Sequence, residues 1–299
     1  MISLTPFTFY LDWMICAQFA GLCWAKAKGL YEAVDLDVQL IPWQEDGRSI
    51  IDKVMMGGLC AGSSEDNLIV SAVANGHDVR AIGTMLQGTP LSLMSRKTQP
   101  IRGMHDLRGK RVGMHSDGIH ALETILTMEG IPLNDLTIQE VTFDLEHLRQ
   151  DRFDVLQGYA MTEPVQLAAL GIEVDVLPVS HARLHPYAQV FFASADCITT
   201  DGAILTRFLA ASMDGWRAAM LNLDETAHII ANLIGDMART AEQRQMLDRL
   251  LPLVAGDLPS DQIGKLDIGQ WHHNLETYHQ FGLIQKALTI HDVLDTTLG

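Results

Sequence analysis

Apolar positions in the first 95 residues switch between a two-residue period, typical of strands, and the wider spacing of amphipathic helices. Alternating or short apolar runs predict strands at Thr8–Leu11, Leu36–Ile41, Leu59–Ser63, Val79–Met85 and Leu91–Ser95. Helical spacing predicts helices at Phe19–Lys28, Gly47–Gly57 and Leu68–Asn75. Two lysines followed by Gly29 form a typical helix stop. Strands that alternate with helices predict a parallel sheet covered on both faces.

A second unit of the same kind follows between about residues 96 and 190. Its predicted strands are Arg111–Met114, Thr137–Val141, Phe153–Leu156 and Val174–Pro178. Its predicted helices are Ile119–Glu129, Leu145–Gln150 and Val165–Leu170. The apolar run Gln189–Ser194 is strand-like and should return the chain to the first unit.

Helical patterns dominate the last hundred residues, at Asp201–Leu221, Asp224–Met237, Thr240–Leu250 and Trp271–Phe281. We therefore expect an α/β clamshell of two lobes, each a doubly wound sheet, with C-terminal helices. Lobe 1 is expected to comprise residues 1–94 plus 191–299, and lobe 2 residues 95–190. Extended crossings near residues 92–96 and 190–194 would join them. A hinged pair of lobes indicates closure over a ligand in the cleft.

Composition narrows the possible partners. Hydrophobic residues make up 47% of the chain and charged residues 19%, which predicts a substantial core. The net charge of −16 leaves no basic stripe for nucleic acid. No apolar run of membrane-spanning length is present. The four cysteines lack metal-type pairing and are interpreted as buried free thiols.

The end of the first strand is the first candidate for a ligand wall. Ligands in open α/β sheets bind beyond the carboxyl ends of the strands, where Asp12, Trp13 and the following loop to Gln18 lie. The Trp13 indole could stack on a flat ligand or pack in the core. Trp24 and Trp43 are interpreted as packing residues.

Polar residues at three predicted helix starts are further candidates. Ser64, Glu65, Asp66 and Asn67 open one helix, and Ser116 with Asp117 opens another; helix capping explains part of each set. The charge of Asp117 opposes an anionic ligand and favours a neutral or cationic one. Glu163 precedes Pro164 at a third helix start, where it either compensates the helix dipole or accepts hydrogen bonds from a ligand amine. Tyr159 flanks it.

No catalytic or metal-binding signature is present in the sequence. A Ser-His-Asp order, a GxSxG elbow, a phosphate loop and an HExxH motif are all missing. His115, His120, His181 and His185 surround the loops of the second unit without the spacing of a metal site. We therefore expect no metal, no cofactor and no turnover.

The order of several motifs resembles the type II periplasmic-binding-protein fold. These are LDW near the start, AKAKGLYEAVDLDVQL, NGHDV, LRGKRVG, VTFDLEHL, FDVLQGYAMTEPVQL and the return strand VFFAS. The chain is most similar to the thiamine-pyrimidine-precursor binding proteins of ABC importers, which are related to the fungal pyrimidine synthases. The resemblance covers roughly residues 8 to 235. Binders of sulfonate, nitrate and taurine share the architecture.

The resemblance implies roles for individual residues. It places Trp13 against the ligand ring, Glu163 near the ring nitrogens and Tyr187 at the strand-end aromatic position before the return crossing. It also marks two departures. Members often have a polar residue or histidine where this chain has Phe19, with Gln18 beside it. The synthases carry a reactant histidine where this chain has Asn67 or Leu68, so the resemblance to an enzyme lacks its key residue.

The expected function is therefore solute capture for an ABC permease, by a monomer that binds a thiamine pyrimidine precursor. The expected ligand-binding residues are Trp13, Gln18, Phe19, Asp66, Asn67, Ser116, Tyr159, Glu163 and Tyr187. The alternatives are a cytoplasmic pyrimidine-synthase-like enzyme and a binder of sulfonate, nitrate or taurine. A periplasmic location would require a leader that has been removed, since none is visible, and a cytoplasmic location stays open.

Overall fold

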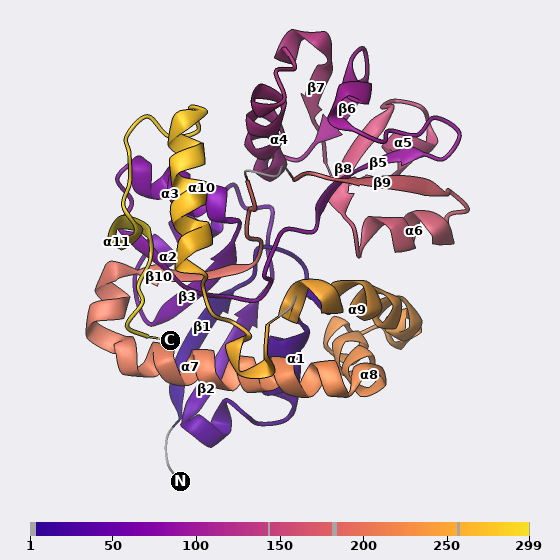
Figure 1. The fold of residues 1–299 in the computed structure, drawn as a ribbon. Coiled ribbons are helices and arrows are strands. Elements are labelled where there is room, and N and C mark those ends of the chain that lie inside the picture. The colour runs from indigo at the N-terminus through magenta and orange to yellow at the C-terminus, as the bar shows by residue number, and fades with distance from the viewer. Residues whose placement is uncertain (1–3, 143, 181–183, 256–257, 299) are drawn as a thin grey trace.

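The computed structural model describes residues 4–142, 144–180, 184–255 and 258–298, and of Asp117 and Ser260 the backbone alone. These residues form two five-stranded sheets with helices packed around them, as Figure 1 shows. The α/β clamshell class expected from the sequence is confirmed. We refer to the part around the first sheet as lobe 1 and to the part around the second sheet as lobe 2.

The first sheet has the strand order β2-β1-β3-β10-β4. Its strands are β1 (Thr5–Tyr10), β2 (Leu36–Ile41), β3 (Cys60–Ser64), β4 (Val79–Thr84) and β10 (Val190–Ser194). β1 pairs in parallel with β2 and β3, as the βαβ pattern predicts. β10 runs antiparallel between β3 and β4, so the return strand completes the middle of this sheet.

The second sheet has the strand order β7-β6-β8-β5-β9. Its strands are β5 (Leu91–Arg96), β6 (Arg111–Met114), β7 (Thr137–Glu140), β8 (Val155–Tyr159) and β9 (Val174–Pro178). β5 and β10 are paired strands rather than free crossings, so the chain passes between the sheets after Thr84 and before Val190. The expected boundaries near residues 94 and 190 fall within β5 and at the start of β10.

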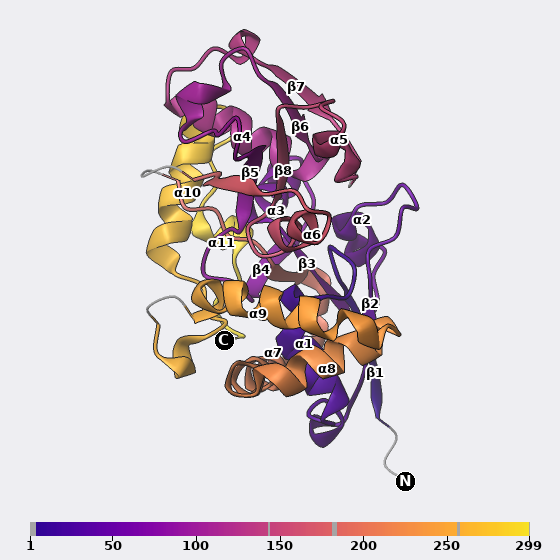
Figure 2. The same ribbon diagram turned by 90° about the vertical axis from the view of Figure 1, so that its right-hand side faces the viewer.

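Lobe 2 carries the helices α4 (Ser116–Met128), α5 (Glu146–Arg149) and α6 (Glu163–Ala169). The other helices surround the first sheet: α1 (Ala20–Ala27), α2 (Ile50–Met55), α3 (Asp66–Ala74), α7 (Ala195–Leu221), α8 (Leu223–Ile234), α9 (Thr240–Ala255), α10 (Ile268–Gln280) and α11 (Ile290–Val293). Figures 1 and 2 show α8 and α9 beside α1, and α10 on the side of α3.

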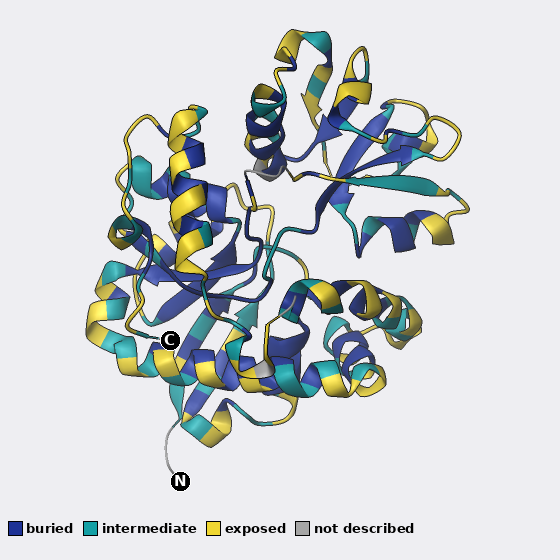
Figure 3. Ribbon diagram, viewed as in Figure 1, coloured by how far each residue is buried: buried dark blue, intermediate teal, exposed yellow. Residues whose placement is uncertain are grey.

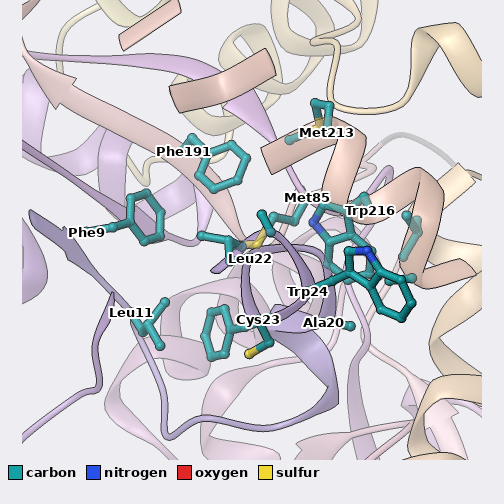
Figure 4. Close-up of a cluster of buried hydrophobic side chains, with 14 of the residues drawn as sticks. Phe9, Leu11, Ala20, Leu22, Cys23, Trp24, Met85, Phe191, Met213 and Trp216 are labelled. Carbon is teal, nitrogen blue, oxygen red and sulfur yellow. The ribbon is translucent and has the colours of Figure 1, made fainter. Parts of the chain in front are cut away.

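One core of lobe 1 lies between the sheet and the helices α1 and α7, and a second includes residues of α2, α3 and α10. Figure 3 shows the central strands β3, β10 and β4 largely buried and the outer helix faces exposed. Figure 4 shows Phe9, Leu22, Met85, Phe191 and Trp216 within the first of these cores. All four cysteines are buried free thiols, which confirms the prediction from their spacing. Burial raises the pKa of the Cys16 thiol to about 12, so Cys16 is not a reactive thiolate.

α1 and α7 cross at a contact between two glycines. A Cβ atom added to Gly21 would lie 2.2 Å from the Trp216 ring, and one added to Gly215 would lie 2.2 Å from the Gly21 carbonyl oxygen. The two backbones therefore approach more closely than any larger side chain allows. This crossing fixes the position of α1. It thereby also holds the loop of residues 12–18, which leads into α1.

Candidate functional site

A cavity of about 410 Å³ lies between the two lobes. Lobe 1 supplies strand ends and one face of α3, including Asp12, Trp13, Trp43 and Glu65. Lobe 2 supplies the ends of β6 and β8 and the starts of α4 and α6. The size is within the range of small-molecule sites, and the position is the cleft that a two-lobed fold closes.

Two tryptophans form one wall of the cavity. β1 and β2 pair in parallel with Tyr10 opposite Ile41, so the residues that follow each strand leave the sheet at the same edge. The Trp43 N–H donates to the Trp13 carbonyl oxygen at 3.1 Å, and the two rings stack with centroids 5.9 Å apart. The sequence predicts a packing role for Trp43, but in the structure Trp43 lines the cavity beside Trp13.

Two of the carboxylates at the cavity are held by neighbours in their own part of the fold. Asp12 accepts hydrogen bonds from the Ser63 hydroxyl and from Gln189 Nε2, both at 2.9 Å. Glu163, at the start of α6, accepts from the Tyr159 N–H at 2.5 Å. These bonds fix both groups in the wall, and for Glu163 they add a local structural role to the predicted ligand contact.

A third carboxylate joins the two lobes. Glu65 precedes α3 in lobe 1, and its Oε1 accepts a short hydrogen bond from the Tyr159 hydroxyl at the end of β8 in lobe 2. Both side chains are partly buried and both line the cavity. The cavity is therefore crossed by a direct polar contact between the lobes.

α3 presents Glu65, Leu68 and Asn75 to the cavity, and it presents Asp66 to α10 instead. Asp66 is fully buried and accepts from the Tyr278 hydroxyl at 2.9 Å and from Asn274 Nδ2 at 3.2 Å. Burial raises the pKa of the Asp66 carboxyl to about 7. The structure thus places Asp66 in a contact between helices rather than at the cavity.

Three other predicted ligand residues also lie away from the cavity wall. Tyr187 is fully buried and stacks on Trp271 at 5.7 Å between ring centroids. Phe19 is fully buried in the core of lobe 1. Asn67 is buried beside Asp66, and its Nδ2 finds no hydrogen-bond acceptor among the described residues. None of these three residues is among the described residues that line the cavity.

The remaining predicted residues, Trp13, Gln18, Ser116, Tyr159 and Glu163, all line the cavity. Near Ser116, the His115 N–H donates to Gln157 Oε1 at 2.9 Å, which fixes the start of α4. A Cβ atom at Gly118 would lie 2.2 Å from Gln157 Oε1, so a larger residue there would displace the Gln157 amide from this position. The side chain of Asp117, predicted to oppose anions, lies outside the described part of the structure.

The described lining of the cavity contains Asp12, Glu65 and Glu163 but neither lysine nor arginine. Sulfonates and phosphates bind most strongly where arginine, lysine or clustered N–H groups compensate their charge. The three carboxylates of this lining are hydrogen-bond acceptors for a ligand that carries N–H or O–H donors. Within the described residues, no cluster of three or more histidine, cysteine or acidic side chains has the arrangement of a metal site.

α9 forms hydrogen bonds to two segments next to the cavity. Gln243 Oε1, buried in α9, accepts from the Ala17 N–H of the cavity loop at 2.8 Å. The neighbouring Glu242 Oε1 accepts from Gln166 Nε2 of α6 at 3.2 Å. α9 therefore contacts both the loop that carries Trp13 and a helix of lobe 2, and Figure 1 shows it between them.

Comparison with known families decides the affiliation of the chain. A family model described as "NMT1/THI5 like" matches residues 16–226, more than two thirds of the chain. The chain belongs to this family. The predicted resemblance to periplasmic binding proteins is thus confirmed at the level of family and fold.

The relatives of this NMT1/THI5-like protein include both a binding protein and an enzyme. It is 26% identical over 303 residues to the riboflavin-binding protein RibY of Chloroflexus aurantiacus, covering 96% of this chain and 84% of the relative. It is 22% identical over 268 residues to a 4-amino-5-hydroxymethyl-2-methylpyrimidine phosphate synthase of Legionella pneumophila, covering 86% of this chain and 84% of the relative.

Among solved structures, the NMT1/THI5-like chain is similar to the periplasmic aliphatic sulphonate binding protein SsuA from Escherichia coli. The TM-score is 0.75 and the identity 17%, with 99% of this chain and 98% of the other covered. The desulfurization enzyme DSZB also matches, with a TM-score of 0.66 and 14% identity over 98% and 97% of the two chains. These similarities establish the periplasmic-binding-protein fold. No helix in the described ranges is both long and apolar enough to cross a membrane.

Proposed function

We propose that this NMT1/THI5-like protein is the solute-binding component of an ABC importer, and that it captures a flat, neutral or cationic nitrogen heterocycle between its lobes. The observation that carries the proposal is the lining of the cavity. Trp13 and Trp43 offer indole surface for stacking, while three carboxylates accept hydrogen bonds and no described lysine or arginine attracts an anion. Delivery to a permease and a periplasmic location belong to the same proposal.

A thiamine pyrimidine precursor, the ligand expected from the sequence, fits this chemistry because its amino group and a protonated ring nitrogen can donate to carboxylates, and its flat ring can stack on the indole wall. A flavin is the second candidate. The cavity of about 410 Å³ has room for more than one small ring, and a relative is named as a riboflavin-binding protein. Both ligands are flat nitrogen heterocycles with N–H donors.

Two observations support binding over the alternatives. The α3 positions where the synthases carry a reactant histidine hold Asn67 and Leu68, which cannot replace imidazole chemistry. The fold is shared with sulphonate-binding proteins, but the acidic lining opposes a sulfonate.

Thermal unfolding in the presence of riboflavin, 4-amino-5-hydroxymethyl-2-methylpyrimidine and ethanesulfonate tests the proposal. A ligand at one hundred times its dissociation constant should stabilise the protein by about 2.7 kcal/mol. We expect this for at least one of the two heterocycles and not for the sulfonate. Preferential stabilisation by ethanesulfonate, or stabilisation by none of the three, would show that the proposed ligand class is incorrect.

A further inference from the structure

Glu65 occupies a position where local helix chemistry does not explain a glutamate. It is the N-cap residue of α3, yet its side chain makes no capping hydrogen bond to the helix. Serine, aspartate and asparagine are the favoured N-cap residues, and the sequence places Ser64, Asp66 and Asn67 around it. Residues that depart from such local sequence preferences are expected at functional sites, and Glu65 lies at a cavity.

The hydrogen bonding of Glu65 also differs from that of the other two cavity carboxylates. Asp12 is held by Ser63 and Gln189, and Glu163 by the backbone of its own turn. The Glu65 carboxylate instead accepts from the Tyr159 hydroxyl across the cleft. Its position therefore depends on the arrangement of the two lobes.

A carboxylate has two oxygens and about four lone-pair sites. Because each carboxylate oxygen can accept more than one hydrogen bond, Glu65 can hold the Tyr159 hydroxyl and also accept a donor from a ligand in the cavity that it lines. Hydrogen bonds to a charged acceptor are stronger than those between neutral groups. A ligand N–H bound here would reinforce the contact between the lobes.

We propose that Glu65 is the residue that selects the ligand: its carboxylate accepts an N–H donor of the bound heterocycle while it holds the Tyr159 hydroxyl of the other lobe. This inference rests on the proposed function and adds to it the residue that recognises the N–H donor of the ligand. It also assigns ligand recognition and lobe closure to one group.

Paired probes and the Glu65→Gln variant test this role by isothermal titration calorimetry. The probes are 4-amino-5-hydroxymethyl-2-methylpyrimidine with its 4-dimethylamino analogue, and riboflavin with 3-methylriboflavin. In Glu65→Gln the amide oxygen can still accept from Tyr159, but the NH₂ group then faces the ligand donor. We expect the affinity for the N–H member of the pair that binds to fall about tenfold or more. The N-methyl member should change by less than about twofold.

Two further variants separate recognition from closure. Tyr159→Phe keeps the carboxylate and removes the bond between the lobes, so it should weaken both members of a pair by the same factor and enlarge the ligand-free protein in small-angle scattering. Tyr10→Phe, on β1 outside the cavity lining, and the exposed Glu32→Gln serve as matched controls that should change neither property.

The outcomes are distinguishable. A selective loss of affinity for the N–H probe in Glu65→Gln supports the assignment. Thermal unfolding verifies that the variant is folded. An equal loss of affinity for both members of a pair, or no loss of affinity, would overturn the role of Glu65 while leaving the proposed function intact. Failure of the unaltered protein to bind either pair would overturn the proposed function and this assignment with it.

Discussion

At the scale of single residues, the indole wall depends on a backbone contact as well as on the rings. The hydrogen bond from the Trp43 N–H to the Trp13 carbonyl holds the ends of β1 and β2 together. Both indoles are partly buried and keep a face toward the cavity. A ligand ring can therefore stack there without first ordering the side chains.

Replacing Trp13 with alanine should lower the affinity for the bound heterocycle by about tenfold or more. The physical reason is the loss of ring stacking, which contributes about 1–3 kcal/mol per ring. Calorimetric titration of Trp13→Ala measures the effect, with Trp13→Phe as a control that retains an aromatic face. An unchanged affinity in Trp13→Ala would contradict the assignment of this wall.

Asp66 should make the stability of the protein depend on pH. Its pKa is raised by burial from the ordinary value of 3.8 to about 7, so between these values the folded protein binds more protons than the unfolded chain. Stability is then greatest below about pH 4 with respect to this group and is lost as the pH rises through about 7. In Asp66→Asn, the unfolding free energy should therefore depend less on pH between about pH 4 and 7.

Urea unfolding at several pH values measures this contribution. Asp292, a partly exposed capping residue whose pKa is lowered mainly by a hydrogen bond from the Thr289 backbone, provides the contrast. Asp292→Asn should remove stability above about pH 4 rather than below it. An unchanged slope in Asp66→Asn would mean that the buried carboxyl does not titrate in this range.

At the scale of elements, the crossing of α1 and α7 brings the two helices together at a pair of glycines. Gly21→Ala would force a methyl group into the Trp216 ring. We expect it to lower the unfolding free energy by about 1–3 kcal/mol, because overpacking displaces side chains from their preferred rotamers. Gly202→Ala in the same α7 helix meets only the end of the Leu298 side chain, at 3.2 Å, and should have little effect.

Thermal and urea unfolding of the two glycine variants give this comparison directly. Helix propensity and the unfolded state favour alanine over glycine in both variants, so similar destabilisation by both would contradict the crossing as the source of the effect. Since the crossing also fixes α1, Gly21→Ala should weaken ligand binding through the Trp13 loop as well.

Most strands and helices could be predicted from the sequence because their period is a local property. Leu36–Ile41, Arg111–Met114 and Val174–Pro178 are strands with the predicted bounds. The position of β10 inside the first sheet, by contrast, depends on pairing with β3 and β4, more than one hundred residues earlier in the chain. Spacing alone carries no information about such pairing.

The site was harder to predict because it depends on orientation. At the start of α3 the cavity receives Glu65, the N-cap residue with an extended backbone, while Asp66, the first helical residue, faces α10. The burial of Tyr187 similarly depends on Trp271, which lies far along the chain. Trp43 could have been found, since parallel pairing of the first two strands places it beside Trp13.

At the scale of the whole molecule, the acidic cavity lies in a chain of net charge −16. A cationic ligand should be drawn to this surface and a neutral one should not. We expect the association rate of the protonated aminopyrimidine to fall several-fold as ionic strength rises from about 0.01 M to about 1 M, because the Debye length shrinks from about 30 Å to about 3 Å.

Stopped-flow quenching of tryptophan fluorescence measures these rates. Neutral riboflavin, followed under the same conditions, is the control and should show a nearly constant association rate. Equal salt dependence for the two ligands would argue against electrostatic attraction as a determinant of capture.

The insertion of β10 between β3 and β4 has a consequence for the order in which a newly made chain can fold. All strands of the second sheet are synthesised before residue 190, so that sheet can form while the first is still divided into β2-β1-β3 and an isolated β4. The Asp295 N–H, which donates to the Ala81 carbonyl at 2.9 Å, is synthesised later still. The lobe that begins the chain is therefore the last to mature, and a polypeptide interrupted before residue 190 leaves the edges of β3 and β4 open to aggregation.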